Sequence, residues 1–176
     1  MLEDTDTAIH HYKVAIDLNP NKSESYYNLG NALCVKADFE RAIYNYKKTI
    51  DLDPYNAPAF YNLGNAYYMI NEFEKAIYAY ASALKLNPDS AECHFNIASA
   101  YNDKGDFNNA LVHYKHSQRY DPNNPETIVN IGAILEQQKL YKEALEQYQA
   151  AAKISPDNAK AYEGMNRVQE LIEHAQ

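Results

Sequence analysis

The chain has 176 residues, of which 46% are hydrophobic and 23% are charged, and its formal net charge at pH 7 is −8. This composition supports a buried core and excludes an intrinsically disordered protein. The negative charge argues against nucleic acids and anionic membranes as partners, because both are bound through clusters of Lys and Arg.

A period of 34 residues organises the whole chain. Prolines recur at this interval, and each closes an apolar run: Pro20, Pro54, Pro88, Pro122 and Pro156. Proline cannot donate the helical hydrogen bond, so each one marks the end of a helix. A fixed period of this length predicts one structural unit repeated several times around a continuous core.

The period divides the chain without any linker between the parts. It predicts a half repeat at 7–22, full repeats at 23–56, 57–90, 91–124 and 125–158, and a capping helix at 159–173. No Gly- or Ser-rich segment interrupts the series, so we expect a single array over residues 1–176. The N-terminal residues lack the basic and apolar regions of a signal peptide. No apolar stretch reaches the roughly 20 residues of a membrane span.

The first predicted helix runs from about Asp6 to Leu18 and has no partner helix before it. Its apolar residues are Ile9, Tyr12, Val14 and Ile16. Part of this surface would be exposed in a lone helix. Two hypotheses follow: the chain is a fragment of a longer array, or a second copy of the chain covers this end by self-association.

Each full repeat predicts two helices joined by a tight turn. In repeat 23–56, apolar residues at helical spacing run from Tyr26 to Val35 and again from Phe39 to Ile50. The break at 36–38 recurs at 70–72, 104–106 and 138–140. Such short connections make the paired helices antiparallel neighbours, which predicts an all-α protein of about ten helices. The last helix has the polar outer surface of a cap and an apolar face formed by Tyr162, Met165, Val168 and Ile172.

The repeat resembles the tetratricopeptide repeat (TPR) family, whose unit is a 34-residue helix–turn–helix. Positions are counted here from the first residue of each full repeat. Small residues stand at position 8 (Gly30, Gly64, Ala98 and Gly132), and alanines at position 20 (Ala42, Ala76, Ala110 and Ala144). Aromatic residues stand at position 24: Tyr46, Tyr80, Tyr114 and Tyr148. The Trp common at position 4 is replaced by Tyr26, Phe60, His94 and Ile128.

The resemblance implies a fold and a type of function. It implies a right-handed α-solenoid of antiparallel helix pairs, in which small residues let the two helices of a repeat approach closely. The first helices of the repeats would line a concave groove, and we therefore expect a protein–protein interaction module that binds an extended or short helical peptide segment there. The alternatives are a structural scaffold, or the non-catalytic, substrate-recruiting array of a larger enzyme such as a protein glycosyltransferase.

The resemblance assigns positions 2, 5, 6, 9, 12 and 13 to this groove. Position 6 is Asn in every full repeat: Asn28, Asn62, Asn96 and Asn130. A carboxamide both donates and accepts hydrogen bonds, so such a ladder could hold a peptide backbone; alternatively, each Asn bonds within the array. The other predicted peptide-binding residues are Tyr27, Tyr61, Phe95, Asn31, Asn65 and Tyr68.

The predicted groove changes character along the chain. Its N-terminal half is aromatic, and its C-terminal half turns acidic through Asp103, Glu126 and Glu136. This favours a neutral or basic peptide with apolar side chains. In the TPR clamp for acidic chaperone C-termini, basic residues occupy three positions that are here Tyr27, Glu92 and Asn96. We therefore exclude such a tail as the ligand.

Nothing in the sequence predicts catalysis or a cofactor. The chain has no phosphate-binding glycine loop, no His-Glu-x-x-His and no Cys-x-x-Cys. His113 and His116 could chelate a metal weakly from one helix, but without a third ligand we expect both to be solvent-exposed. Cys34 and Cys93 lie almost two repeats apart, too far for a disulfide. Free thiols predict a reducing compartment such as the cytoplasm.

Overall fold

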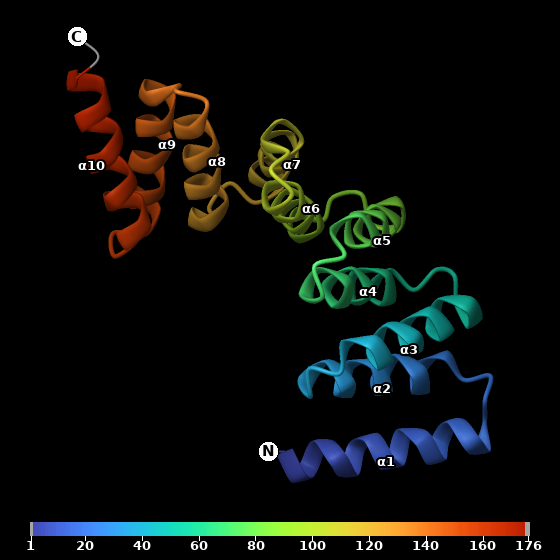
Figure 1. Cartoon of the computed structure of the whole chain (residues 1–176). Helices are drawn as coiled ribbons and strands as arrows, with labels where there is room; N and C mark the ends of the chain where they lie inside the picture. Colours follow the sequence, from blue (N-terminus) through green and yellow to red (C-terminus); the bar gives the residue numbers. More distant parts are fainter. Residues whose placement is uncertain (1, 175–176) are drawn as a thin grey trace. The chain divides into compact units, whose positions relative to one another are not determined.

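The computed structural model describes residues 2–174, and all regular secondary structure in that range is α-helical (Figure 1). Within these residues, the prediction of an all-α fold with about ten helices is confirmed. The helices are α1 (Leu2–Leu18), α2 (Ser23–Val35), α3 (Phe39–Leu52), α4 (Ala57–Met69), α5 (Phe73–Leu86), α6 (Ala91–Asp103), α7 (Phe107–Tyr120), α8 (Pro125–Gln137), α9 (Tyr141–Ile154) and α10 (Ala159–His174).

The helices form two compact bodies. The N-terminal body, Met1–Asp89, contains α1 to α5, and the C-terminal body, Ser90–Gln176, contains α6 to α10. Within each body, helices adjacent in sequence pack against each other, and α10 packs on α8 as well as α9. The division falls at the end of the repeat predicted at 57–90.

The predicted break within each repeat is a turn that contains one residue with positive φ. These residues are Ala37 (φ 57°), Asn71 (φ 60°), Gly105 (φ 80°) and Lys139 (φ 62°). Left-handed backbone lets the chain reverse and satisfies carbonyls at the end of the first helix. In the first such turn, the amide of Asp38 donates to the carbonyl of Leu33 at 2.9 Å. The sequence predicted where these turns lie, although only one of the four has glycine at this position.

Each periodic proline follows the end of a helix, as predicted. The helices α1, α3, α5, α7 and α9 all end two residues before a proline, at Leu18, Leu52, Leu86, Tyr120 and Ile154. The intervening residue is extended or nearly so, with φ of −137° and ψ of 88° at Asp53. This is the conformation that a following proline favours. The prolines thus stop each second helix so that the next repeat can begin.

The repeated tyrosines and small residues form the core between helices. Tyr46, Tyr80 and Tyr148 are each 1% exposed. A Cβ placed on Gly64 would lie 2.5 Å from the Tyr80 ring, and one on Gly164 would lie 2.5 Å from the Tyr148 ring. Glycine therefore sets the distance between a first helix and the tyrosine of its neighbour. The prediction that small residues allow close helix packing is confirmed.

Both terminal helices differ in detail from their predictions. The first helix begins at Leu2, four residues before the predicted start at Asp6. In α10 the buried residues are Ala161, Gly164 and Val168, whereas Tyr162 is 44% exposed. The predicted apolar face was therefore wrong at Tyr162. The small residues Ala161 and Gly164 face the body instead, and Gly164 lies so close to the Tyr148 ring that an added Cβ would be 2.5 Å from it.

Candidate functional site

The predicted groove residues lie on the first helices of the repeats. In the N-terminal body these are α2 and α4, and in the C-terminal body they are α6 and α8. Residues three or four positions apart in a helix share a face, which groups positions 2, 5, 6, 9, 12 and 13 on each helix. All ten predicted residues are partly buried: Asn28, Asn62, Asn96, Asn130, Tyr27, Tyr61, Phe95, Asn31, Asn65 and Tyr68.

In the N-terminal body, Asn62 links α4 to α2. Its Nδ2 donates to the hydroxyl of Tyr27 at 3.1 Å and to Oδ1 of Asn31 at 3.0 Å. The same Oδ1 of Asn31 accepts a hydrogen bond from the hydroxyl of Tyr46 at 2.9 Å. Three predicted site residues therefore belong to one hydrogen-bond network, anchored by a tyrosine of the core.

Cys34 joins this network through Tyr46. Its Sγ lies 3.4 Å from the Tyr46 hydroxyl. Burial raises the pKa of the Cys34 thiol, and the hydrogen bond with Tyr46 only partly opposes that effect. Burial, followed by the contact with Cys34, also raises the pKa of Tyr46. Both groups stay neutral at pH 7, so this thiol lacks the thiolate character of a reactive cysteine.

The aromatic residues of this face rest on the tyrosines of the core. The Tyr27 ring lies 6.1 Å from the Tyr46 ring, and the Tyr61 ring lies 5.8 Å from the Tyr80 ring. Tyr80 in turn donates a hydrogen bond to Oδ1 of Asn65 at 2.8 Å. These contacts hold partly exposed aromatic rings in fixed orientations on the surface of α2 and α4.

The C-terminal body repeats the arrangement with different partners. Asn130 donates from Nδ2 to the hydroxyl of Tyr114 at 3.2 Å, and Ser99 lies 3.0 Å from the same hydroxyl. Phe95 packs edge-on against Tyr114, with ring centroids 5.5 Å apart. At position 5 of the next repeat, Val129 is only 6% exposed. The first helices of the C-terminal body therefore expose fewer aromatic side chains at position 5 than those of the N-terminal body.

The carboxylate of Glu136 forms an ion pair with Arg167, a contact that the sequence did not predict. Arg167 on α10 donates to both carboxylate oxygens of Glu136, each at 3.0 Å, and the hydroxyl of Tyr148 donates to Oε2 at 2.7 Å. Burial alone would raise the pKa of Glu136, but these hydrogen bonds outweigh it and hold that pKa below its ordinary value. Glu136 therefore adds less negative charge to this face than expected.

Three histidines gather on the C-terminal body. His94 Nδ1 lies 3.1 Å from His113 Nδ1, and the His94 ring stacks on the His116 ring with centroids 5.0 Å apart. Burial and the neighbouring imidazoles lower the pKa of His113 to about 4. The expectation that His113 is solvent-exposed was therefore wrong. The sequence missed the cluster because His94 is nineteen residues away from His113, on the other helix of the repeat.

Within residues 2–174, no group of three or more His, Cys, Asp or Glu side chains has an arrangement that could hold a metal ion. Both cysteines are free thiols. In the described part of the chain, none of the helices is long and apolar enough to cross a membrane.

Stacked antiparallel helix pairs, with a side-chain network on their first helices, define a helical repeat protein of the protein-interaction class. Comparison with family profiles identifies the repeat. Profiles described as TPR repeat match residues 2–34 and 36–71, and profiles described as tetratricopeptide repeat match 57–90 and 101–168. The chain belongs to the tetratricopeptide repeat family. A search of the curated proteins returned no significant match.

Solved structures of TPR proteins have the same fold. The crystal structure of MamA is 30% identical, with a TM-score of 0.85, and the match covers 90% of this chain and 92% of that chain. YrrB, described as a TPR protein with an unusual peptide-binding site, is 23% identical, with coverages of 92% and 84% and a TM-score of 0.79. PilF of Pseudomonas aeruginosa is 20% identical, with coverages of 97% and 78% and a TM-score of 0.82.

Proposed function

We propose that the first-helix face of each body, on α2 and α4 in the N-terminal body and on α6 and α8 in the C-terminal body, binds an extended or short helical peptide segment of a partner protein. The position-6 asparagines would contact the peptide backbone, and the position-5 aromatic residues would contact its side chains. The structural neighbour YrrB is described as having a peptide-binding site, which supports a peptide as the ligand. The chain would act as an adaptor without catalytic activity of its own.

The observation that carries the proposal is the orientation of the Asn62 amide. Both of its hydrogen bonds within the described residues are donated by Nδ2, and its Oδ1 accepts none there. Asn62 is only partly buried, so this oxygen remains available as an acceptor. Asn130 likewise uses Nδ2 to reach Tyr114. A peptide N–H would therefore be bound by Oδ1, and the amide would not bridge both backbone groups of one peptide residue.

The surroundings of the asparagines favour a particular kind of peptide. Tyr27 and Tyr61 offer large apolar rings whose orientation is already set by core contacts, which lowers the entropy lost on binding. On the C-terminal body, Asp103 and Glu126 are exposed acidic residues. A neutral or basic peptide with apolar side chains would complement both features.

The test uses a peptide library displayed on phage and selected on the wild-type chain. Dissociation constants of the selected peptides are then measured with Asn28→Ala and with Asn62→Ala/Asn96→Ala. Asn28→Ala is the cleaner change, because the Asn28 side chain makes no hydrogen bond with other side chains or backbone among residues 2–174. We expect each lost backbone contact to weaken binding by roughly three- to tenfold, equivalent to ~1 kcal/mol.

The matched control is Asn166→Ala, an exposed asparagine on α10. It should leave every dissociation constant unchanged. If all selected peptides bind both asparagine variants as tightly as the wild-type chain, the asparagines do not contact the ligand and the proposal is wrong.

A second function, self-association, is supported by the outer surface of α1. Leu18 is 82% exposed and Val14 is 40% exposed, whereas Ile9 is buried against the body. We expect wild-type chains to associate as their concentration rises, and Leu18→Lys/Val14→Lys to prevent it. Sedimentation velocity over a hundredfold concentration range measures this, with Leu171→Lys as the control. A concentration-independent monomer would exclude self-association.

A further inference from the structure

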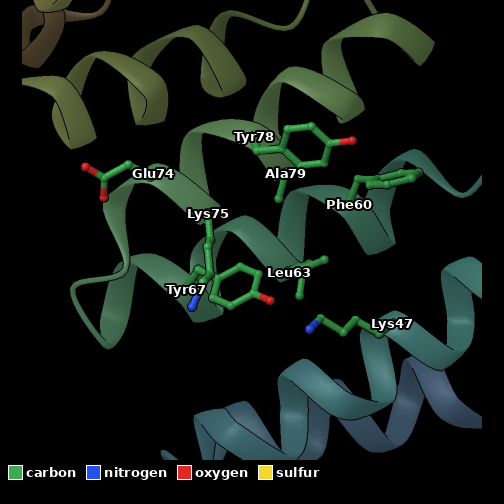
Figure 2. Close-up of a pocket in the computed structure, with 8 residues that line it drawn as sticks. All are labelled: Lys47, Phe60, Leu63, Tyr67, Glu74, Lys75, Tyr78 and Ala79. Atoms are coloured by element: carbon green, nitrogen blue, oxygen red, sulfur yellow. The ribbon is translucent and has the colours of Figure 1, made fainter.

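A pocket opens in the N-terminal body between α3, α4 and α5, and it is separate from the asparagine network. Its volume is about 300 Å³ and its wall is almost entirely apolar. Leu63, Tyr67 and Ala79 form the wall, and Phe60 and Glu74 border it. Figure 2 shows the Glu74 carboxylate directed away from the Tyr67 ring. This volume lies at the lower end of the range for ligand pockets, roughly 300–1,000 Å³. The pocket has room for one large apolar group.

The pocket lies on the opposite side of α4 from the proposed peptide face. With 3.6 residues per turn, Phe60, Leu63 and Tyr67 fall together on one side of the helix. Tyr61 and Asn65 fall on the other side. A ligand in the pocket would therefore not compete with a peptide at Asn62, and the two sites can be tested independently.

Two lysines border the pocket at the Tyr67 ring. The Nζ of Lys47 lies 5.7 Å from the ring centroid, and the Nζ of Lys75 lies 5.8 Å from it. Figure 2 shows the ring between these two amino groups. Lys75 also pairs with Glu72 at 3.0 Å, whereas Lys47 has no carboxylate partner among residues 2–174. An apolar pocket bordered by cations is complementary to an apolar group that carries a negative charge beside it.

Exposed aromatic surface extends beyond the pocket. Tyr78 borders the pocket and is 73% exposed, and Tyr44 at the same repeat position on α3 is 59% exposed. Lys48 lies over the Tyr44 ring at 5.9 Å. Exposed aromatic rings interleaved with lysines cover more area than one small ligand needs, and such patches are typical of protein interfaces.

The same repeat positions in the C-terminal body have a different chemistry. Lys115 corresponds to Lys47, but Glu143 and Glu146 replace Lys75 and Tyr78. One repeat earlier, Lys13, Arg41 and Tyr44 occupy the corresponding positions, but Leu33 and Asn45 replace Tyr67 and Ala79 there. The aromatic ring between two lysines, on a fully apolar wall, is therefore a property of this particular pocket. Lys115 provides a matched control for Lys47.

We propose that this pocket binds one aromatic or leucine-sized side chain from an acidic segment of a partner protein. The side chain would fill the space between Leu63, Tyr67 and Ala79. Carboxylates flanking it in the partner's sequence would pair with Lys47 and Lys75. This partner would differ in charge from the neutral or basic peptide proposed for the asparagine face.

The experiment titrates the isotope-labelled 176-residue chain with the pentapeptide Glu-Glu-Phe-Glu-Glu and follows the backbone amides of the chain by NMR. We expect saturable shifts centred on Leu63, Tyr67 and Ala79. Replacing Phe by Ala, or the four Glu by Gln, should weaken peptide binding at least fivefold. Shifts centred on α2 and the Asn62 face, or no saturation at millimolar peptide, would overturn the proposal.

Two variants test the pocket itself. Lys47 lies on the surface, so Lys47→Glu should not disturb folding. It should weaken peptide binding at least tenfold, whereas Lys115→Glu should have no effect on binding. Ala79→Leu should block the pocket, provided that its circular dichroism matches that of the wild-type chain. Equal binding by Lys47→Glu and wild type would overturn the proposal. Equally tight binding of free 3-phenylpropionate would overturn the protein-segment assignment and indicate a small-molecule site.

Discussion

At the scale of single residues, contacts between glycines and core tyrosines determine how closely neighbouring helices pack. The same contact occurs in both bodies: Gly30 with Tyr46, and Gly132 with Tyr148. The ring carbon nearest to a Cβ added at Gly30 would lie 2.7 Å away. A methyl group in that space would have to displace the Tyr46 ring, which is itself fully packed. Only glycine therefore fits at this position without moving the tyrosine.

Gly64→Ala tests this contact, because the added Cβ would lie 2.5 Å from the Tyr80 ring. We expect the unfolding free energy to fall by about 1–3 kcal/mol, as is usual for overpacking. Alanine is otherwise the better helix former by ~1 kcal/mol, so a gain in stability would contradict this account. Gly132→Ala, with a nearest distance of 2.9 Å, should cost less. Urea denaturation followed by circular dichroism measures both.

At the scale of elements, the turns between paired helices carry a local conformational cost. Left-handed backbone costs ordinary L-residues roughly 1–2 kcal/mol and costs glycine little. Three of the four turns nevertheless use Ala37, Asn71 or Lys139 at this position. The tertiary packing of the helix pair therefore outweighs the local preference at these turns.

Ala37→Gly should relieve this strain at a residue with φ of 57°. We expect the unfolding free energy to rise by about 0.5–1 kcal/mol, since the greater freedom of glycine in the unfolded chain offsets part of the gain. Gly105→Ala, at φ of 80°, provides the reciprocal change and should lower stability by a similar amount. Thermal and urea unfolding of both variants check the two signs together.

The histidine contact between α6 and α7 predicts a pH dependence. Burial chiefly lowers the pKa of His113 from 6.5 to about 4, and burial also lowers that of His94. The folded chain thus binds protons less readily than the unfolded chain. The resulting stability is fully present above pH 6.5 and is lost as pH falls from 6.5 toward 4.

We expect the unfolding free energy to be lower at pH 5 than at pH 7 by on the order of 1 kcal/mol, with allowance for solvent screening. His113→Asn should reduce this difference, and His10→Asn, at an exposed position on α1, should not. Urea denaturation at the two pH values measures it. An unchanged pH dependence in His113→Asn would show that other groups are responsible.

At the scale of the whole molecule, the terminal helix is attached to its body by both packing and charge. Val168 on α10 is fully buried, and Arg167 beside it forms a two-point ion pair with Glu136 on α8. The pair joins the cap to a helix that is not its neighbour in sequence. The Glu136 side chain is 18% exposed, so removing its partner would leave a largely buried charge.

Arg167→Ala should lower the unfolding free energy by about 1–2 kcal/mol at pH 7. Because hydrogen bonds from Arg167 and Tyr148 hold the pKa of Glu136 below its ordinary value of 4.5, this penalty should shrink as pH falls below 4.5. Lys75→Ala removes an exposed ion pair with Glu72 and should cost less than ~0.5 kcal/mol. A cost for Arg167→Ala no larger than for Lys75→Ala would show that the Glu136 pair adds little.

The sequence by itself determined the family, the helices and most of their ends, because period and proline spacing are local properties of the chain. It also grouped Tyr27 with Asn31 on one face of a helix, since helical geometry groups residues a few positions apart, and the resemblance to the TPR family assigned Asn62 to the same groove. It could not show that these three side chains bond to each other. That depends on how closely α2 and α4 approach, which the core tyrosines and glycines decide.

Only the tertiary structure decided the contacts between residues of different helices. The His94–His113 contact, the Arg167–Glu136 pair and the pocket beside Tyr67 each join side chains of different helices. Such contacts depend on side-chain length and on the space between packed helices, neither of which has a period. The sequence therefore predicted the scaffold and its candidate peptide face, while packing determined the charge, the pairing and the cavities on its surface.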